Sequence, residues 1–291
     1  EFPARFRGLF LGFLQTGYPI GWALASVFAA WMLSHYNWRL MFLFGLVSLP
    51  LALLVQRLVR EPERFVTARA RDAEEKTRPR LREVFAPGLK SRVIILFCAQ
   101  FMFVWAYAAS IFLFPSYLNE ARGLEAFDFS VLIGAGNAIG IVGYILAALT
   151  GEFLLTRRTT VVLWTLIGAA LFQLLVWWAE GFRQLLLCYG AMSMFFYGVA
   201  AVKFAYLAEI VPTRLRATAM AVCGSLAVTL GSAAGPLMVA RAVESFGWAL
   251  GYSVVVGVPL VLAGLLYLLL TPVPSGLEVE AIETMLAEPA R

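Results

Sequence analysis

Long apolar stretches separated by short polar segments set the pattern of this chain. A helix of ~20 residues crosses a hydrocarbon layer of ~30 Å. Backbone polar groups in lipid must bond within their own segment, so each long stretch is predicted to be a transmembrane helix. The eight predicted spans are residues 8–33, 39–58, 93–118, 129–150, 159–179, 183–207, 217–242 and 248–270.

The composition agrees with a membrane protein. Hydrophobic residues make up 61% of the 291 residues, and charged residues only 14%. A soluble domain of this size could not cover so much apolar surface. The predicted fold class is therefore an all-α polytopic membrane protein, embedded in a lipid bilayer.

The basic residues predict the orientation. With the N-terminus in the cytoplasm, eighteen Lys and Arg residues fall on the inner side, and four fall on the outer side: Arg39, Arg122, Arg183 and Arg241. This is the positive-inside bias of membrane proteins, and it places both termini in the cytoplasm. The net charge of +5 then reflects topology, and no nucleic-acid partner is expected. We expect the cell membrane, in bacteria the inner membrane, as the location.

A repeat relates the two ends of the chain. Pro3, Arg5 and Arg7 open one Gly-rich apolar run, and the same P-x-R-x-R pattern opens another at Pro212. Trp38 follows Arg7 by 31 residues, and a second Trp follows the second copy at nearly the same spacing. Both copies begin on the cytoplasmic side, as in a parallel transporter repeat. Four spans lie between residue 93 and the second copy, so we expect four further spans upstream of the first copy, and twelve in the intact protein.

A set of short motifs is spread over the whole chain: Arg7-Gly8, Trp38-Arg39, Arg60-Glu61-Pro62-Glu63, Pro115-x-Tyr117-Leu118, Glu209-x-x-Pro212-Thr213-Arg214-x-Arg216-Ala217-Thr218 and Gly235-Pro236. In these motifs the chain resembles the major facilitator superfamily of secondary transporters. This resemblance implies eight helices, the fifth to the twelfth, of a twelve-helix fold. The chain is most similar to metabolite:proton symporters for organic acids, with sugar porters close behind.

The resemblance also implies a domain organisation. Residues 1–58 correspond to the last two helices of the N-terminal half, 59–92 to a polar cytoplasmic central loop, 93–272 to the six-helix C-terminal half, and 273–291 to a cytoplasmic tail. One loop departs from the family pattern. Members carry Gly-x-x-x-Asp-Arg-x-Gly-Arg-Arg between two helices of each half, whereas residues 151–158 read Gly-Glu-Phe-Leu-Leu-Thr-Arg-Arg. Without the Asp, the charge relay that the resemblance implies is not expected in this half.

Enzyme chemistry is not predicted. The single histidine, in a short outer loop, excludes a two-histidine metal site, and neither a phosphate-binding Gly-Lys-Ser/Thr loop nor a Ser/His/Asp set can be assembled. We expect no metal and no cofactor, with a proton as the coupling ion. None of the spans carries a carboxylate at mid-depth, so the coupling acid is expected in helices upstream of this chain.

Transport requires polar groups at mid-depth that face a cavity. The candidate substrate-binding residues are Gln100, Trp105, Tyr107, Asn137, Tyr197 and Lys203. Gln100 and Tyr107 are seven residues apart and share a helix face. The alternatives are hydrogen bonds between helices for the amides and packing for the aromatic residues. By resemblance, spans 93–118 and 183–207 line the cavity of the second half.

Lys203 is the one basic residue that lies more than one position inside the ends of its predicted span. A bound carboxylate would offset the cost of ~3 kcal/mol for holding a charge in the membrane. The alternative is that the ammonium group reaches the nearby headgroups or pairs with Glu209. Other charged residues at the cytoplasmic ends of helices are candidates for a gate or an anchor, and a purely topological role of the arginines is their alternative. They are Arg5, Arg7, Arg157, Arg158, Glu209, Arg214 and Arg216.

The sequence therefore predicts a secondary transporter that takes up a small organic anion by alternating access, coupled to protons. Two other classes remain open: a sugar porter or exporter of the same fold, and a nontransporting membrane scaffold. The intact protein is expected to be a monomer whose partner is a small-molecule substrate.

Overall fold

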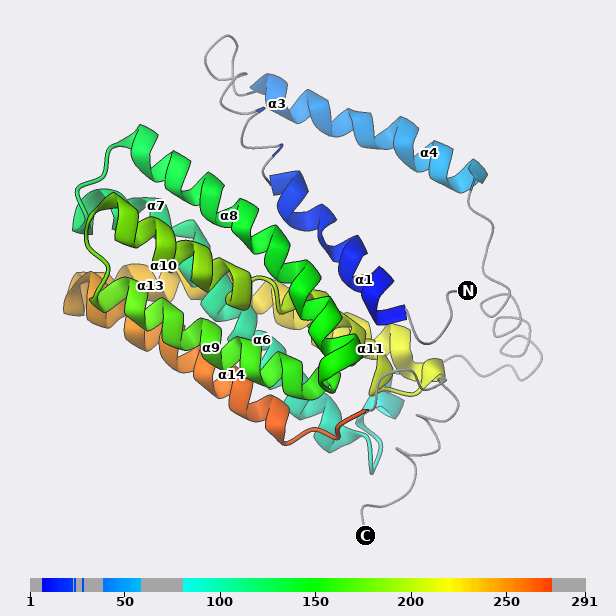
Figure 1. Ribbon diagram of the computed structural model, residues 1–291. Coiled ribbons are helices and arrows are strands. Elements are labelled where there is room, and N and C mark those ends of the chain that lie inside the picture. The colour runs from blue at the N-terminus through cyan, green and yellow to red at the C-terminus, as the bar shows by residue number, and fades with distance from the viewer. Residues whose placement is uncertain (1–6, 23, 25–27, 29–38, 59–80, 274–291) are drawn as a thin grey trace. The chain divides into compact units, whose positions relative to one another are not determined.

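The computed structural model describes residues 7–22, 24, 28, 39–58 and 81–273 (Figure 1). The chain forms two compact units, one of Glu1 with residues 20–79 and one of residues 2–19 with 80–291. The described part contains helices and helical turns and no strand. These are α1 (Arg7–Gln15), α3 (Arg39–Phe44), η2 (Gly45–Val47), α4 (Ser48–Leu58), η3 (Leu81–Phe85), α6 (Lys90–Phe112), α7 (Phe114–Ser116), η4 (Tyr117–Ala121), α8 (Ala126–Leu149), η5 (Thr150–Leu154), α9 (Arg157–Trp177), α10 (Gly181–Phe196), α11 (Ala200–Glu209), η6 (Thr213–Leu215), α12 (Arg216–Ala219), η7 (Met220–Leu226), α13 (Ala227–Tyr252), η8 (Ser253–Gly257) and α14 (Val258–Leu268).

Within the described residues, five helical stretches are long and apolar enough to cross a membrane. They are Lys90–Phe112, Phe127–Leu154, Arg157–Trp177, Gly181–Glu209 and Arg216–Leu268. The last one contains two of the predicted spans, and Gly247, whose φ of 76° is outside the helical range, separates them. The predicted span 39–58 corresponds to the shorter apolar helix Phe42–Leu58. The predicted span 8–33 lies partly outside the described residues.

In the smaller unit, α3, η2 and α4 follow one another directly. No side chain of η2 or α4 is buried, and Leu49, Leu51 and Leu53 expose about three fifths of their surface, between 59% and 61%. An apolar helix whose side chains are exposed on every side suits a hydrocarbon environment. The exposed apolar side chains of α4 therefore agree with the predicted span 39–58.

In the larger unit, the long helices lie lengthwise along one another (Figure 1). Both α13 and α14 pack against α6, and α14 also packs against α9. The α10 helix contacts α8 and α9, while α1 packs against α8 and α11. Because every backbone group in lipid must bond within its own helix, such a bundle is the form that these apolar stretches are expected to take. Its interior holds one continuous cluster of buried apolar side chains.

Glycines allow the closest helix approaches in this bundle. A Cβ atom at Gly231 would lie 2.9 Å from the carbonyl oxygen of Phe101, and one at Gly235 would overlap the carbonyl oxygen of Trp105. On α8, a Cβ at Gly143 would likewise overlap the carbonyl oxygen of Met194 on α10. Small residues let helix backbones approach in the absence of a hydrophobic driving force between lipid-embedded helices. These glycines thus join α13 to α6 and α8 to α10.

Gly235→Ala is expected to destabilise the bundle by about 1–3 kcal/mol, because α13 must move away from α6 to accommodate the methyl group. Gly134→Ala is the matched control, since a Cβ at Gly134 meets no atom within 4 Å. Unfolding of the purified protein by SDS in mixed micelles measures both variants. Equal stability of the two variants would show that the α6–α13 contact does not depend on glycine.

Candidate functional site

Two of the candidate residues on α6 form hydrogen bonds with residues of η8 and α14. Gln100 is buried, and its Oε1 accepts a hydrogen bond of 3.5 Å from the hydroxyl of Tyr267 on α14. Its Nε2 has no partner among the described residues. Trp105 donates its indole N–H to the carbonyl oxygen of Val255 in η8, at 3.1 Å. Trp105 thus makes a contact between helices, whereas Gln100 retains an unused hydrogen-bond donor.

Tyr107 and Tyr197 come together in the structure, although they lie on α6 and at the end of α10. Their rings meet edge to face, with centroids 5.2 Å apart, and both also contact the ring of Phe196. Tyr189 lies 6.5 Å from Tyr197, measured between ring centroids. The hydroxyl of Tyr189 donates to Oδ1 of Asn137 at 3.4 Å. Three candidates from three helices therefore belong to one aromatic and polar cluster.

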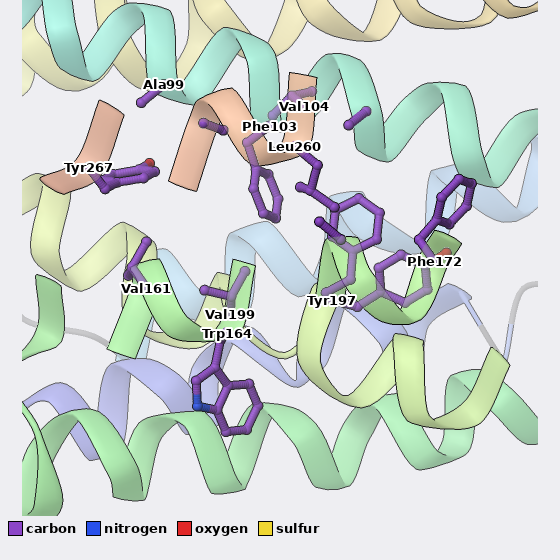
Figure 2. Close-up of a cluster of buried hydrophobic side chains, with 14 of the residues drawn as sticks. Ala99, Phe103, Val104, Val161, Trp164, Phe172, Tyr197, Val199, Leu260 and Tyr267 are labelled. Carbon is purple, nitrogen blue, oxygen red and sulfur yellow. The ribbon is translucent and has the colours of Figure 1, made fainter. Parts of the chain in front are cut away.

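Lys203 is buried on α11, with an exposed fraction of 2%. Its Nζ lies 3.5 Å from the centroid of the Phe103 ring and 5.3 Å from that of Phe204. In Figure 2, Phe103 and Tyr197 enter the same buried cluster from their two helices. The ring of Phe196 lies edge to face with that of Phe103, at 5.4 Å between centroids, and joins Lys203 to the tyrosines.

The alternative role for Lys203, an ion pair with Glu209, is not what the structure contains. Both carboxylate oxygens of Glu209 accept from Nη1 of Arg157 at 2.6 Å. Among the described residues, no carboxylate forms a salt bridge with Lys203. Aromatic rings are therefore the groups that face its ammonium.

A buried ionic cluster links three helical segments. Arg157 begins α9, Glu209 ends α11, and Glu152 lies in the π-helical turn η5. Nη2 of Arg157 donates to Oε2 of Glu152 at 2.6 Å, while Nη1 serves Glu209. The three side chains are almost completely buried. The guanidinium of Arg157 thus forms ion pairs with both carboxylates.

Glu152 is the residue that the sequence argument missed. Because residues 151–158 lack the Asp of the family pattern, no charge relay was expected in this loop. In the structure, the carboxylate of Glu152, the residue after Gly151, forms a salt bridge with Arg157. The available signal was an acidic residue five positions before the arginine, at the end of an apolar helix.

Of the other gate or anchor candidates, Arg158 and Arg214 contact groups outside this cluster. Arg158 donates to the carbonyl oxygen of Leu270 at 2.8 Å, just after the end of α14. Arg214 forms a salt bridge of 3.1 Å with Glu83, and both side chains are substantially exposed, so water screens the pair. Arg216 begins α12 and is partly buried. Arg5 and the side chain of Arg7 lie outside the described residues.

The family follows from a comparison that covers more than half of the chain. Residues 1–157 match the model of the Major Facilitator Superfamily. The chain belongs to the major facilitator superfamily. The predicted all-α polytopic membrane fold is thereby confirmed, and the relatives below confirm the resemblance to organic acid transporters of this family. The family and the relatives below are transporters and not enzymes.

Several curated relatives are organic acid transporters by name. The chain is 26% identical over 273 residues to the cis,cis-muconate transport protein of Acinetobacter baylyi, covering 91% of the chain and 64% of that protein. It is 27% identical over 241 residues to the probable 4-methylmuconolactone transporter of Cupriavidus pinatubonensis, covering 79% and 53%. It is 26% identical over 231 residues to the citrate-proton symporter of Salmonella typhi, covering 72% and 48%. The chain thus spans less than two thirds of the length of each.

Proposed function

We propose that this major facilitator protein takes up a small organic anion by alternating access and couples the uptake to protons. It acts as a monomer in the cell membrane, with both chain ends in the cytoplasm. Lys203 binds the carboxylate of the substrate, and Tyr107, Tyr197 and Asn137 contact the rest of the molecule. The names of three relatives, which refer to cis,cis-muconate, 4-methylmuconolactone and citrate with protons, support this choice of substrate.

The observation that carries the proposal is the environment of Lys203. The side chain is buried, faces the rings of Phe103 and Phe204, and has no carboxylate partner among residues 81–273. A cation at depth in a membrane protein marks a substrate or ion pathway in most cases, because holding it there is costly. An arriving carboxylate supplies the missing counter-charge and forms a charge-assisted hydrogen bond with the ammonium.

A carrier of this kind is expected to accumulate labelled cis,cis-muconate in proteoliposomes when the outside is made acidic. The protein is produced from its own start codon, and entry of the label is followed by filtration. Because protons move inward with the substrate, dissipating the gradient with a protonophore is expected to abolish accumulation while leaving exchange of internal for external muconate intact.

Other outcomes identify the alternatives. Loss of preloaded muconate that is driven by an acidic exterior indicates an exporter. Uptake of a neutral sugar, with no uptake of any carboxylate, indicates a sugar porter. Absence of transport in every assay indicates a membrane scaffold. Each of these results contradicts uptake of an organic anion.

A further inference from the structure

The ammonium of Lys203 contacts the face of an aromatic ring, although a buried cation is expected to have a negatively charged partner. The Nζ atom lies 3.5 Å from the centroid of Phe103, well inside the limit of about 6 Å for a cation–π contact. The negative face of the ring attracts the cation, but the attraction is weaker than that of a full counter-charge. Phe103 is itself 3% exposed, so it cannot swing freely into solvent. Phe103 thus stands where a substrate carboxylate would have to compete for the ammonium.

If a substrate carboxylate displaces the Phe103 ring from the ammonium of Lys203, the ring is left beside the first carbons of the substrate. The carboxylate binds Nζ, and the first carbons of the substrate then lie beside the ring that the ammonium contacted. Flat unsaturated carbons stack on a ring face or meet its edge, and such aromatic pairs gain affinity beyond the area that they bury. A saturated chain, with hydrogens above and below its carbon plane, makes this contact less well.

Contacts between buried aromatic rings continue beyond Phe103. Phe196 lies edge to face with Phe103 at 5.4 Å between centroids, and Tyr107 and Tyr197 lie next along the row. The contacts reach Tyr189, whose hydroxyl donates to the amide oxygen of Asn137 and whose ring also stacks on Phe114 at 4.5 Å between centroids.

We infer that Phe103 is a specificity-determining residue that selects carboxylates conjugated to carbon–carbon double bonds over saturated acids of the same length. The inference rests on the proposed function, since it assumes that Lys203 binds the carboxylate. It adds a residue that the sequence argument did not single out, and it narrows the substrate from organic anions to planar unsaturated acids.

Competition assays test this selection. Uptake of labelled cis,cis-muconate into proteoliposomes is inhibited by unlabelled muconate or by adipate, its saturated six-carbon counterpart, and a second pair uses benzoate and cyclohexanecarboxylate. The wild-type protein is expected to prefer the unsaturated member of each pair by about three- to tenfold, the size of one aromatic contact. Phe103→Leu is expected to bring the preference close to one, and Phe103→Tyr to retain it. Phe204→Leu, which removes the ring 5.3 Å from Nζ, is the matched control and should keep most of the preference.

The preference is a ratio within one variant, so it does not depend on how much folded protein each variant yields. Transport of muconate and adipate with equal affinity by the wild type, or an unchanged preference in Phe103→Leu, overturns the role of Phe103 and leaves the proposed function standing. Failure of the wild type to transport or bind any of the carboxylates overturns both.

Discussion

Replacing Arg157 with methionine is expected to lower the free energy of unfolding by about 3–5 kcal/mol, because two buried carboxylates lose their shared counter-charge. Glu152 and Glu209 each accept a hydrogen bond of 2.6 Å from this guanidinium, and the cluster is nearly inaccessible to water. Unfolding by SDS in mixed micelles, followed by tryptophan fluorescence, measures the loss.

The neighbouring arginine provides the control. Arg158→Met removes the same charge from the same turn of α9 but breaks only hydrogen bonds to carbonyl oxygens near the end of α14, so about 1 kcal/mol is expected. If Arg157→Met and Arg158→Met unfold at the same SDS fraction, the buried cluster does not stabilise the protein.

A variant with a neutral cluster distinguishes a role in gating from a role in stability alone. The combined variant Arg157→Met, Glu152→Met, Glu209→Met leaves no charge on these three side chains, and replacement of a buried ion cluster by apolar side chains of similar volume is often neutral for stability. We expect this variant to regain most of the lost stability. If the cluster holds one conformation of the transport cycle closed, the variant still transports slowly despite its recovered fold. Recovery of both properties together contradicts the gate and leaves the arginine as an anchor.

Lys203→Gln is expected to raise the Michaelis constant for muconate uptake by about ten- to a hundredfold, because a charge-assisted hydrogen bond contributes about 1.5–3 kcal/mol. Lys203→Arg keeps the charge and should retain part of the affinity, although the wider guanidinium does not reproduce the geometry of the ammonium. Uptake rates at several muconate concentrations give the constant for each variant.

Arg183→Gln is the charge-matched control for this variant. Arg183 is exposed at the start of α10, so its loss changes the net charge of the protein equally without touching the bundle interior. An unchanged Michaelis constant in Lys203→Gln rules out the carboxylate role of Lys203, whatever Arg183→Gln does.

The spans could be predicted from the sequence because a helix in lipid must be long and apolar, and both properties are local. The boundary at Gly247 and the burial of Gly231 and Gly235 against α6 also follow from residue type, since glycine tolerates a positive φ and permits close helix contact. The pairing of helices does not follow in this way. Apolar helix faces in lipid resemble one another, so the sequence does not say that α14 packs against both α6 and α9.

The residue types and the positions along the spans indicated the candidate site residues, but the sequence did not indicate which side chains contact them. Lys203 stood out as a basic residue in an apolar span, whereas Phe103 was one apolar residue among many until the structure placed it under the ammonium. Glu152 was similarly hidden, because its bond to Arg157 depends on how the turn η5 meets α9 and α11. Contacts between segments decide both cases, and a single sequence carries little information about them.

The most direct test of an anion site at Lys203 is ligand-dependent stability, because it requires binding alone. A ligand at a hundred times its dissociation constant stabilises the folded state by about 2.7 kcal/mol. At a muconate concentration a hundred times the wild-type dissociation constant, the unfolding temperature of the purified protein is expected to rise for the wild type and for Arg183→Gln, and to rise by about half as much or less for Lys203→Gln, which binds more weakly. An equal upward shift in Lys203→Gln, or no shift in the wild type at saturating muconate, contradicts the account.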